Sequence, residues 1–191
     1  MLKSKLKWNF TYNDEMQHDF FFDDIDLSPL TRKLLWKRNI TDRESAERFL
    51  FPSLDHLHDP FLMEGMKESV ERVRQAIKKE ENILVFGDYD ADGVSATSVM
   101  VEALREAGAD CDFYIPNRFT EGYGPNEEAF RKAKENGIDV IITVDTGIAA
   151  VHEAEVAKEL GMDLIITDHH EVQEELPAAY AIIHPKASAS Y

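Results

Sequence analysis

The sequence predicts an α/β protein with a mostly parallel sheet and helices on both faces, preceded by a small, mainly helical segment. From residue 82 onward, short apolar runs rich in β-branched residues alternate with longer helical segments that end at glycine. Parallel strands need such crossover helices, so the alternation favours a parallel sheet. The 191 residues, 43% hydrophobic and 30% charged, suit a globular chain of one or two domains. We expect two domains, over residues 1–80 and 81–191.

Two short helices are expected in the first domain, after an irregular, aromatic-rich start. Ser28 and Pro29 form an N-cap and first-turn pair ahead of "LTRKLLWKRN". Thr41 and Glu44 give a capping-box pattern ahead of "DRESAERFL". Such helix pairs occur in DNA-binding helix-turn-helix motifs and, more often, as packing modules.

A third helix is expected over about residues 62–79. Its apolar residues recur at i, i+4, i+7 and i+11, namely Met66, Val70, Val73 and Ile77. This spacing gives one apolar stripe along a helix.

The second domain is expected to hold five strands and three helices between them. The strands are 82–86, 112–115, 139–144, 163–167 and 180–184, and the helices are 93–108, 127–137 and 149–161. Gly108 and Gly137 are the expected C-terminal glycines of the first two helices.

Polar residues that suit metal and phosphate chemistry follow every expected strand. They are, strand by strand, Asp88, Asp90 and Asp92; Asn117 and Arg118; Asp145; Asp168, His169 and His170; and His184. In an open α/β sheet, ligands bind outside the carboxyl ends of the strands. Close carboxylates repel one another unless something positive lies among them, so this edge is expected to hold cations.

The charge of the chain is unevenly distributed. Residues 1–80 hold 14 basic and 15 acidic residues, whereas residues 81–191 hold 7 and 22, for a total net charge of −16. A segment this acidic repels DNA unless cations or basic elements elsewhere offset its charge.

The single cysteine, Cys111, excludes an internal disulfide framework and fits a reducing cytoplasm. We read no signal peptide and no apolar run of the roughly 20 residues that cross a bilayer, so no membrane partner is expected.

Three kinds of site compete for the stretch "DYDADG". A calcium loop of the EF-hand type needs a glutamate at its twelfth position, where this chain has Val99, and a helix in front rather than a strand. Asp90 to Gly93 also resembles the nucleophile motif of haloacid-dehalogenase-like phosphatases, which leaves the adjacent histidines of "DHH" without a role. The third reading is a two-metal phosphoesterase.

The two-metal reading accounts for more of the residues. Two divalent ions about 3.5–4 Å apart need several carboxylates, with imidazoles if manganese-like metals are preferred. The candidate ligands are Asp90, Asp92, Asp145 and His169. Arg118 has the planar fork that holds a phosphate. Gly122 and Gly124 of "EGYG" would let the backbone approach a nucleic-acid strand closely.

Four motifs, "VFGDYDADGVSA", "PNRFTEGYG", "VDTGI" and "TDHH", resemble in order and spacing the DHH phosphoesterase family. The preceding "LTRKLLWKRNITDRESAERFLFPSLDHLHDPF" is similar to the N-terminal segment of the RecJ single-strand-specific exonucleases within it. The resemblance implies a cofactor of two manganese or magnesium ions. It also implies digestion of single-stranded DNA from the 5′ end in repair and recombination, beside a helicase and a single-strand-binding protein.

The resemblance also implies roles for individual residues. Asp90 and Asp92 would bind different metals, Asp145 would bridge them and His169 would be a further ligand. His170 would lie beside the metals and the scissile phosphate. Asp88 would lie next to the ligands, and Asp168 would contact the ligands rather than the metals. The "PNRFTEGYG" loop would bind substrate through Asn117, Arg118, Gly122, Tyr123 and Gly124.

Two departures from the family pattern matter. The family usually has Asn-Pro where this chain has His184 and Pro185, which leaves the role of His184 open. The family's remaining aspartate ligand and its C-terminal domains would lie beyond residue 191, so we expect this chain to be the front portion of a longer enzyme and to be inactive alone.

The alternatives are a family member that hydrolyses small phosphoesters, such as oligoribonucleotides or cyclic dinucleotides, and a non-catalytic module that holds a structural ion. The N-terminal segment argues against the first, since the smaller enzymes resemble this chain only from about residue 82.

Overall fold

The computed structural model describes residues 27–189, which form two compact units divided after Leu57. The aromatic-rich start expected ahead of residue 27 lies outside the described residues. Within residues 27–189, no helix is both long enough and apolar enough to cross a bilayer.

The first unit contains α1 (Pro29–Trp36), α2 (Arg43–Leu50) and a single turn of 3₁₀ helix, η1 (Leu54–His56). Ser28 caps α1 as expected, since its side chain accepts a hydrogen bond from the backbone N–H of Thr31. The expected cap of α2 at Thr41 is wrong by one residue. Asp42 has the extended backbone of an N-cap, and its carboxylate accepts from the backbone N–H of Ser45 at 2.9 Å.

The second unit is a five-stranded sheet in the order β2-β1-β3-β4-β5, with every neighbouring pair parallel. This confirms the predicted fold class. Its elements along the chain are η2 (Pro60–Leu62), α3 (Met66–Lys79), β1 (Asn82–Phe86), α4 (Ala91–Glu106), β2 (Cys111–Tyr114), α5 (Glu127–Glu135), β3 (Ile138–Val144), α6 (Val151–Glu159), β4 (Asp163–Thr167) and β5 (Ala181–Ile183). Gly108 and Gly137 both have positive φ, as expected of glycines that follow helices.

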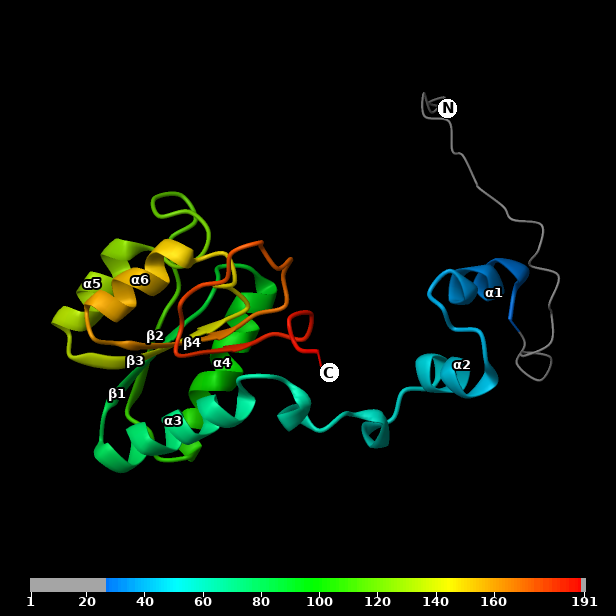
Figure 1. The fold of residues 1–191 in the computed structure, drawn as a ribbon, viewed down its shortest axis with the longest axis horizontal. Coiled ribbons are helices and arrows are strands. Elements are labelled where there is room, and N and C mark those ends of the chain that lie inside the picture. The colour runs from blue at the N-terminus through cyan, green and yellow to red at the C-terminus, as the bar shows by residue number, and fades with distance from the viewer. Residues whose placement is uncertain (1–26, 190–191) are drawn as a thin grey trace, which may run out of the picture. The chain divides into compact units, whose positions relative to one another are not determined.

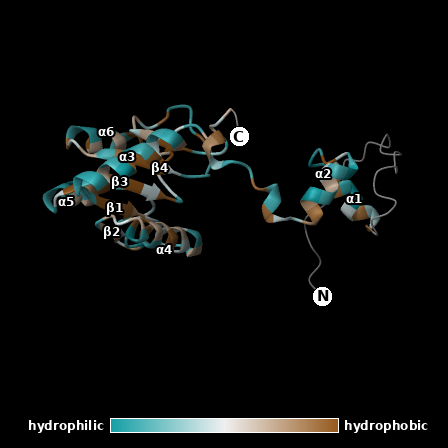
Figure 2. Ribbon diagram, turned by 90° about the horizontal axis from the view of Figure 1, so that it is seen from below, coloured by the Kyte–Doolittle hydropathy of each residue, from teal (hydrophilic) through white to brown (hydrophobic). Residues whose placement is uncertain are grey.

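Helices cover both faces of the sheet, with α5 and α6 on one side and α3 and α4 on the other (Figure 1). Side chains alternate between these faces along β1. Ile83 and Val85 join the core beneath α3 and α4, whereas Leu84 and Phe86 join the core beneath α5 and α6. Figure 2 shows the same layering, with apolar strands between helices that carry hydrophilic residues.

Helix α3 differs from its prediction in both its start and its buried face. The helix begins at Met66 rather than near residue 62, directly after Gly65, whose φ is +76°. A Cβ at Gly65 would lie 2.4 Å from the carbonyl oxygen of Ile182, so this close approach to β5 requires glycine.

The expected apolar stripe of α3 is only half-buried, and its fully buried residues are Ser69, Arg72 and Ala76. Arg72 is buried because it pairs with two acids at the start of the strands. Its Nε lies 2.5 Å from Oδ2 of Asp163, and its Nη1 lies 2.6 Å from Oε2 of Glu81. A paired guanidinium therefore lies under the helix where the spacing predicted only apolar side chains.

Candidate active site

The loop after β1 is tightly packed against the start of α4. Asp90 caps the helix, with its Oδ1 accepting from the backbone N–H of Gly93 at 2.9 Å. A Cβ at Gly93 would lie 2.6 Å from the carbonyl oxygen of Asp88, so only glycine fits there. Helix α4 begins at Ala91, two residues before its expected start, and carries Asp92 exposed in its first turn.

Asp88 is the buried member of the three aspartates. Its side chain points into the protein with 2% of its surface exposed, and its Oδ1 has no hydrogen-bond partner among the described residues. Burial, with the nearby charges of Asp90 and Asp145, raises the pKa of the Asp88 carboxyl. A buried carboxylate oxygen without a donor, among other carboxylates, fits the neighbourhood of a bound cation.

Asp145 follows β3 in an uncommon backbone conformation. Its φ is +60°, which few residues other than glycine, asparagine and aspartate adopt. Its backbone N–H donates to the carbonyl oxygen of Thr167 at 3.0 Å, which continues the pairing of β3 with β4. Its side chain is 8% exposed, and its Oδ1 lies 2.8 Å from Nε2 of His169. Strained residues of this kind cluster at functional sites.

Asp168 organises the loop after β4. Its Oδ2 accepts from the backbone N–H of Ile148 at 2.9 Å, and its Oδ1 accepts from the backbone N–H of His169 at 2.7 Å. The same Oδ1 lies 2.7 Å from Nδ1 of His170. Burial alone would raise the pKa of the Asp168 carboxyl, but the hydrogen bonds from Ile148 and His170 outweigh it and lower that pKa. Asp168 is therefore an ionised group that fixes the backbone of both histidines.

The two ring nitrogens of His170 face different partners. Nδ1 is hydrogen-bonded to Asp168, and Nε2 is directed toward the loop that follows β2. Its Nε2 lies 3.5 Å from the hydroxyl of Tyr123. The hydrogen bond to Asp168 raises the pKa of the His170 imidazole, and the charges of Asp145 and Asp90 act in the same direction. The rings of His169 and His170 lie 4.7 Å apart.

His184 supports the loop from inside the protein rather than joining the cluster. Its side chain is fully buried, with Nε2 2.9 Å from the carbonyl oxygen of His170. Its Nδ1 accepts from the backbone N–H of Lys186 at 3.1 Å, so the hydrogen bonds assign the proton to Nε2. The ring thus ties the end of β5 to the backbone of the two histidines.

The loop between β2 and α5 presents Arg118 beside these groups. The guanidinium of Arg118 lies 5.1 Å from the centre of the Tyr89 ring, and the Tyr89 and Tyr123 rings lie 6.3 Å apart, edge to face. Asn117 uses its Oδ1 to accept from the backbone N–H of Phe119 at 2.9 Å, which shapes the turn around Arg118.

The two glycines of this loop differ in their surroundings. Both have positive φ, +85° at Gly122 and +82° at Gly124. A Cβ at Gly122 would meet open space, whereas one at Gly124 would lie 3.3 Å from Oγ1 of Thr146. Gly124 therefore lets the loop pack closely against Thr146.

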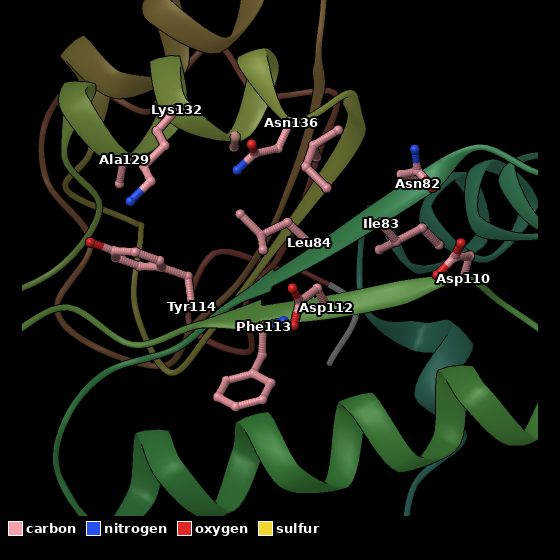
Figure 3. A pocket seen from close by; sticks show the side chains of 12 residues that line it. Asn82, Ile83, Leu84, Asp110, Asp112, Phe113, Tyr114, Ala129, Lys132 and Asn136 are labelled. Atoms are coloured by element: carbon pink, nitrogen blue, oxygen red, sulfur yellow. Dashed lines mark hydrogen bonds between the residues drawn. The ribbon is translucent and has the colours of Figure 1, made fainter.

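Two hollows of the sheet differ in their relation to this cluster. A cleft of about 670 Å³ lies directly beside the cluster, with Tyr123, Asp168 and His170 among its lining residues. A cavity of about 360 Å³ lies between edge strand β2 and helix α5, lined by Leu84, Tyr114 and other residues (Figure 3). None of the residues predicted to form the site lines this second cavity.

The arrangement of donors fits a divalent metal. Within residues 27–189, Asp145, His169 and His170 offer ligand atoms that all lie within 4.8 Å of one another. Carboxylate oxygens with imidazole nitrogens suit manganese-like ions. The predicted ligands Asp90 and Asp92 are not part of this group: Asp90 acts on His170 through its charge, and Asp92 lies exposed in the first turn of α4.

A family model described as "DHH family, N-terminal domain" matches residues 82–190. The chain belongs to this family. It is also similar to curated single-stranded-DNA-specific exonucleases named RecJ. The relative from Bacillus subtilis (strain 168) is 54% identical over 97% of this chain and 24% of its own length. The relative from Escherichia coli (strain K12) is 37% identical over 84% of this chain and 27% of its own length. This DHH chain thus spans about a quarter of the length of the curated relatives it matches.

Solved structures agree with the sequence relatives. An exonuclease RecJ bound to manganese superposes with a TM-score of 0.66 at 32% identity, over 71% of this chain and 34% of that one. RecJ in complex with Mn²⁺ from Thermus thermophilus gives a TM-score of 0.63 at 28% identity, over 81% of this chain and 21% of that one. The DHH sheet described above is therefore shared with manganese-bound relatives.

Proposed function

We propose that this chain is the front portion of a metal-dependent exonuclease that degrades single-stranded DNA from the 5′ end during repair and recombination. The observation that carries the proposal is the cluster of carboxylates and imidazoles where the strands end, centred on Asp145, His169 and His170. The 54% identity to a single-stranded-DNA-specific exonuclease RecJ extends over 97% of the chain, so it includes the segment ahead of the DHH match. A separate domain over residues 1–80 stays a proposal from the sequence, since the compact units of the structure divide after Leu57 and place α3 with the sheet.

Two divalent ions, manganese or magnesium, are the proposed cofactors, held by Asp90, Asp92, Asp145 and His169. When bound, such ions activate water and neutralise the charge that develops on the phosphate oxygens. Asp145 would be a ligand of these ions, since its carboxylate is almost fully buried and lies 2.8 Å from the imidazole of His169, a second proposed ligand. Asp88 and Asp168 lie around these groups: Oδ1 of Asp88 has no donor among the described residues, and Asp168 is hydrogen-bonded to both histidines.

The other residues orient the substrate. Nδ1 of His170 is engaged by Asp168, which leaves Nε2 to face a phosphate oxygen near Tyr123. Arg118 would hold a phosphate with its planar guanidinium, which lies over the Tyr89 ring. We assign strand contacts to Asn117, Arg118, Gly122, Tyr123 and Gly124 of the same loop.

A DHH hydrolase of small phosphoesters is the main alternative, and a module that only holds an ion is the second. The similarity to RecJ ahead of residue 82 favours the exonuclease. The DHH match over residues 82–190 is compatible with all three functions, whereas the similarity ahead of it is to an exonuclease. We further propose a cytoplasmic location and work beside a helicase and a single-strand-binding protein.

The test uses the full-length protein with Mn²⁺ and three substrates: 5′-labelled single-stranded DNA, the same DNA as a duplex, and a cyclic dinucleotide. We expect mononucleotide release from the single strand alone, and its loss in Asp90→Ala but not in Glu155→Ala, an exposed residue of α6. Preferential cleavage of the cyclic dinucleotide would support the small-substrate alternative. Metal binding without any hydrolysis would support the ion-holding module.

A further inference from the structure

The loop that carries Arg118 is exposed, yet it has a defined shape. Asn117, Arg118 and Thr120 are all exposed, and Phe119 is 92% exposed. No apolar side chain therefore anchors the tip of this loop in the core. Backbone order at Arg118 must come from hydrogen bonds within the loop and from its two ends.

Glu121 makes the contacts that close the loop. Its Oε2 accepts from the backbone N–H of Asn117 at 2.7 Å, and its own backbone N–H donates to the carbonyl oxygen of Asn117 at 2.9 Å. These reciprocal bonds enclose Arg118 in a single turn, in the manner of a capping box. The other carboxylate oxygen, Oε1, accepts a hydrogen bond from the hydroxyl of Tyr114.

Tyr114 connects this turn to the core. It is the last residue of β2, and its ring centre lies 5.3 Å from that of Phe86, which is fully buried. Figure 3 shows the Tyr114 hydroxyl directed away from Leu84. The hydrogen bonds from Tyr114 and from the Asn117 amide lower the pKa of the Glu121 carboxyl. Glu121 is thus an ionised acceptor between a ring fixed in the core and the backbone beside Arg118.

We propose that Glu121 is a positioning residue that, through Tyr114 and Asn117, holds Arg118 in place to bind a phosphate of the DNA strand. The proposal rests on the proposed function of Arg118. The Arg118 guanidinium lies over the Tyr89 ring, and Glu121 accepts a hydrogen bond from the backbone of Asn117, the residue directly before Arg118. A phosphate clamp works best when its geometry is set before the substrate arrives, since a mobile arginine loses conformational freedom on binding.

The test is a double-mutant cycle on the full-length protein with Mn²⁺ and single-stranded DNA. We expect Glu121→Ala to lower kcat/KM about tenfold, the effect of losing a charge-assisted hydrogen bond. Tyr114→Phe, which keeps the ring on Phe86, should lower it about threefold. Because Glu121 is proposed to act through Arg118, adding Glu121→Ala to Arg118→Ala should lower kcat/KM by less than about twofold.

Glu128→Ala is the matched control. Glu128 is an exposed acid close enough to Tyr114 to affect its pKa, but it lies outside the loop and its hydrogen bonds. We expect Glu128→Ala to leave kcat/KM unchanged. That result would show that the loss of one negative charge does not cause the effect of Glu121→Ala. A full additional loss from Glu121→Ala in the Arg118→Ala background would overturn the positioning role.

Hydrogen exchange at residues 116–124 separates this proposal from the function of Arg118. We expect Glu121→Ala, but not Glu128→Ala, to accelerate exchange there while metal content stays unchanged. If exchange accelerates and Arg118→Ala keeps full activity, the role of Arg118 is wrong but the loop contacts stand. If Arg118→Ala is impaired and Glu121→Ala changes neither exchange nor kcat/KM, the positioning role is wrong and the proposed function stands.

Discussion

Nε2 of His169 lies 2.8 Å from Oδ1 of Asp145, although 24 positions separate the two residues along the chain. The register of two neighbouring parallel strands sets this distance. Val144 at the end of β3 pairs with Thr167 at the end of β4, so the residues that follow them lie on the same edge. A change that shifts the pairing of β3 with β4 would therefore separate the pair, even without touching either side chain.

Gly93→Ala should distort the start of α4 and the aspartate loop before it. The added Cβ would lie 2.6 Å from the carbonyl oxygen of Asp88, and backbone rather than a flexible side chain would have to move. We expect a loss of about 1–3 kcal/mol in the free energy of unfolding, the usual cost of overpacking. Thermal unfolding of the full-length protein measures it, with Ser98→Ala on the exposed side of α4 as control. Equal melting temperatures for both variants would contradict the packing described here.

Arg72→Met should weaken the attachment of α3 to the sheet. The substitution keeps much of the apolar stem but leaves Glu81 and Asp163 without their partner. We expect a loss of about 2–3 kcal/mol, as for hydrogen bonds that involve charged groups. Arg74→Met, at an exposed position of the same helix, should cost less than about 0.5 kcal/mol. Comparable unfolding free energies for the two variants would show that the buried pairing contributes nothing.

The expected strands and the polar residues after them could be predicted because both depend on local patterns. An apolar run of four to seven residues can be buried in the sheet, and the carboxyl ends of parallel strands meet at one edge. The ends of β1 and β4 were therefore placed correctly at Phe86 and Thr167. The grouping of Asp145 with His169 and His170 follows from the same geometry.

The supporting contacts could not be predicted because they join distant parts of the chain. Arg72 pairs with Asp163 across 91 positions, and nothing in the periodicity of α3 indicates a buried guanidinium. His184 also gave no local signal that its ring would lie under the backbone of His170. The cap at Asp42 instead of Thr41 is a different kind of error. Both residue types are good N-caps, and only the backbone conformation shows which of the two caps the helix.

Tyr114 should titrate well above an exposed tyrosine. Burial and the hydrogen bond to Glu121 raise the pKa of Tyr114 from 10.0 to about 12. Because the folded pKa is the higher one, this contribution to stability is complete below pH 10 and is lost as the pH rises through 12. Tyrosinate absorbance after a rapid pH jump, in wild type minus Tyr114→Phe, should show one phenol titrating near 12, and Glu121→Gln should lower its pKa. A Tyr114 that titrates together with the exposed tyrosines would contradict the hydrogen bond.

Residues 1–191 alone should show negligible exonuclease activity in millimolar Mn²⁺. The resemblance places a further aspartate ligand beyond residue 191, and an incomplete set of ligands binds one of two ions weakly. The net charge of −16 also opposes binding of a DNA strand. Release of mononucleotides from single-stranded DNA is the measurement, with Asp90→Ala to exclude contamination. Robust release that depends on Asp90 would show that the chain needs nothing more.

Asp145→Asn in the full-length protein tests the central claim most directly, because asparagine tolerates the positive φ at this position and removes only the charge. Exonuclease activity on single-stranded DNA with Mn²⁺ is measured together with bound metal and melting temperature, beside Glu155→Gln as control. The account predicts that Asp145→Asn keeps its fold, loses bound metal and loses at least about 100-fold in kcat/KM, while Glu155→Gln matches wild type. An Asp145→Asn enzyme with full metal content and more than about a tenth of wild-type kcat/KM would contradict it.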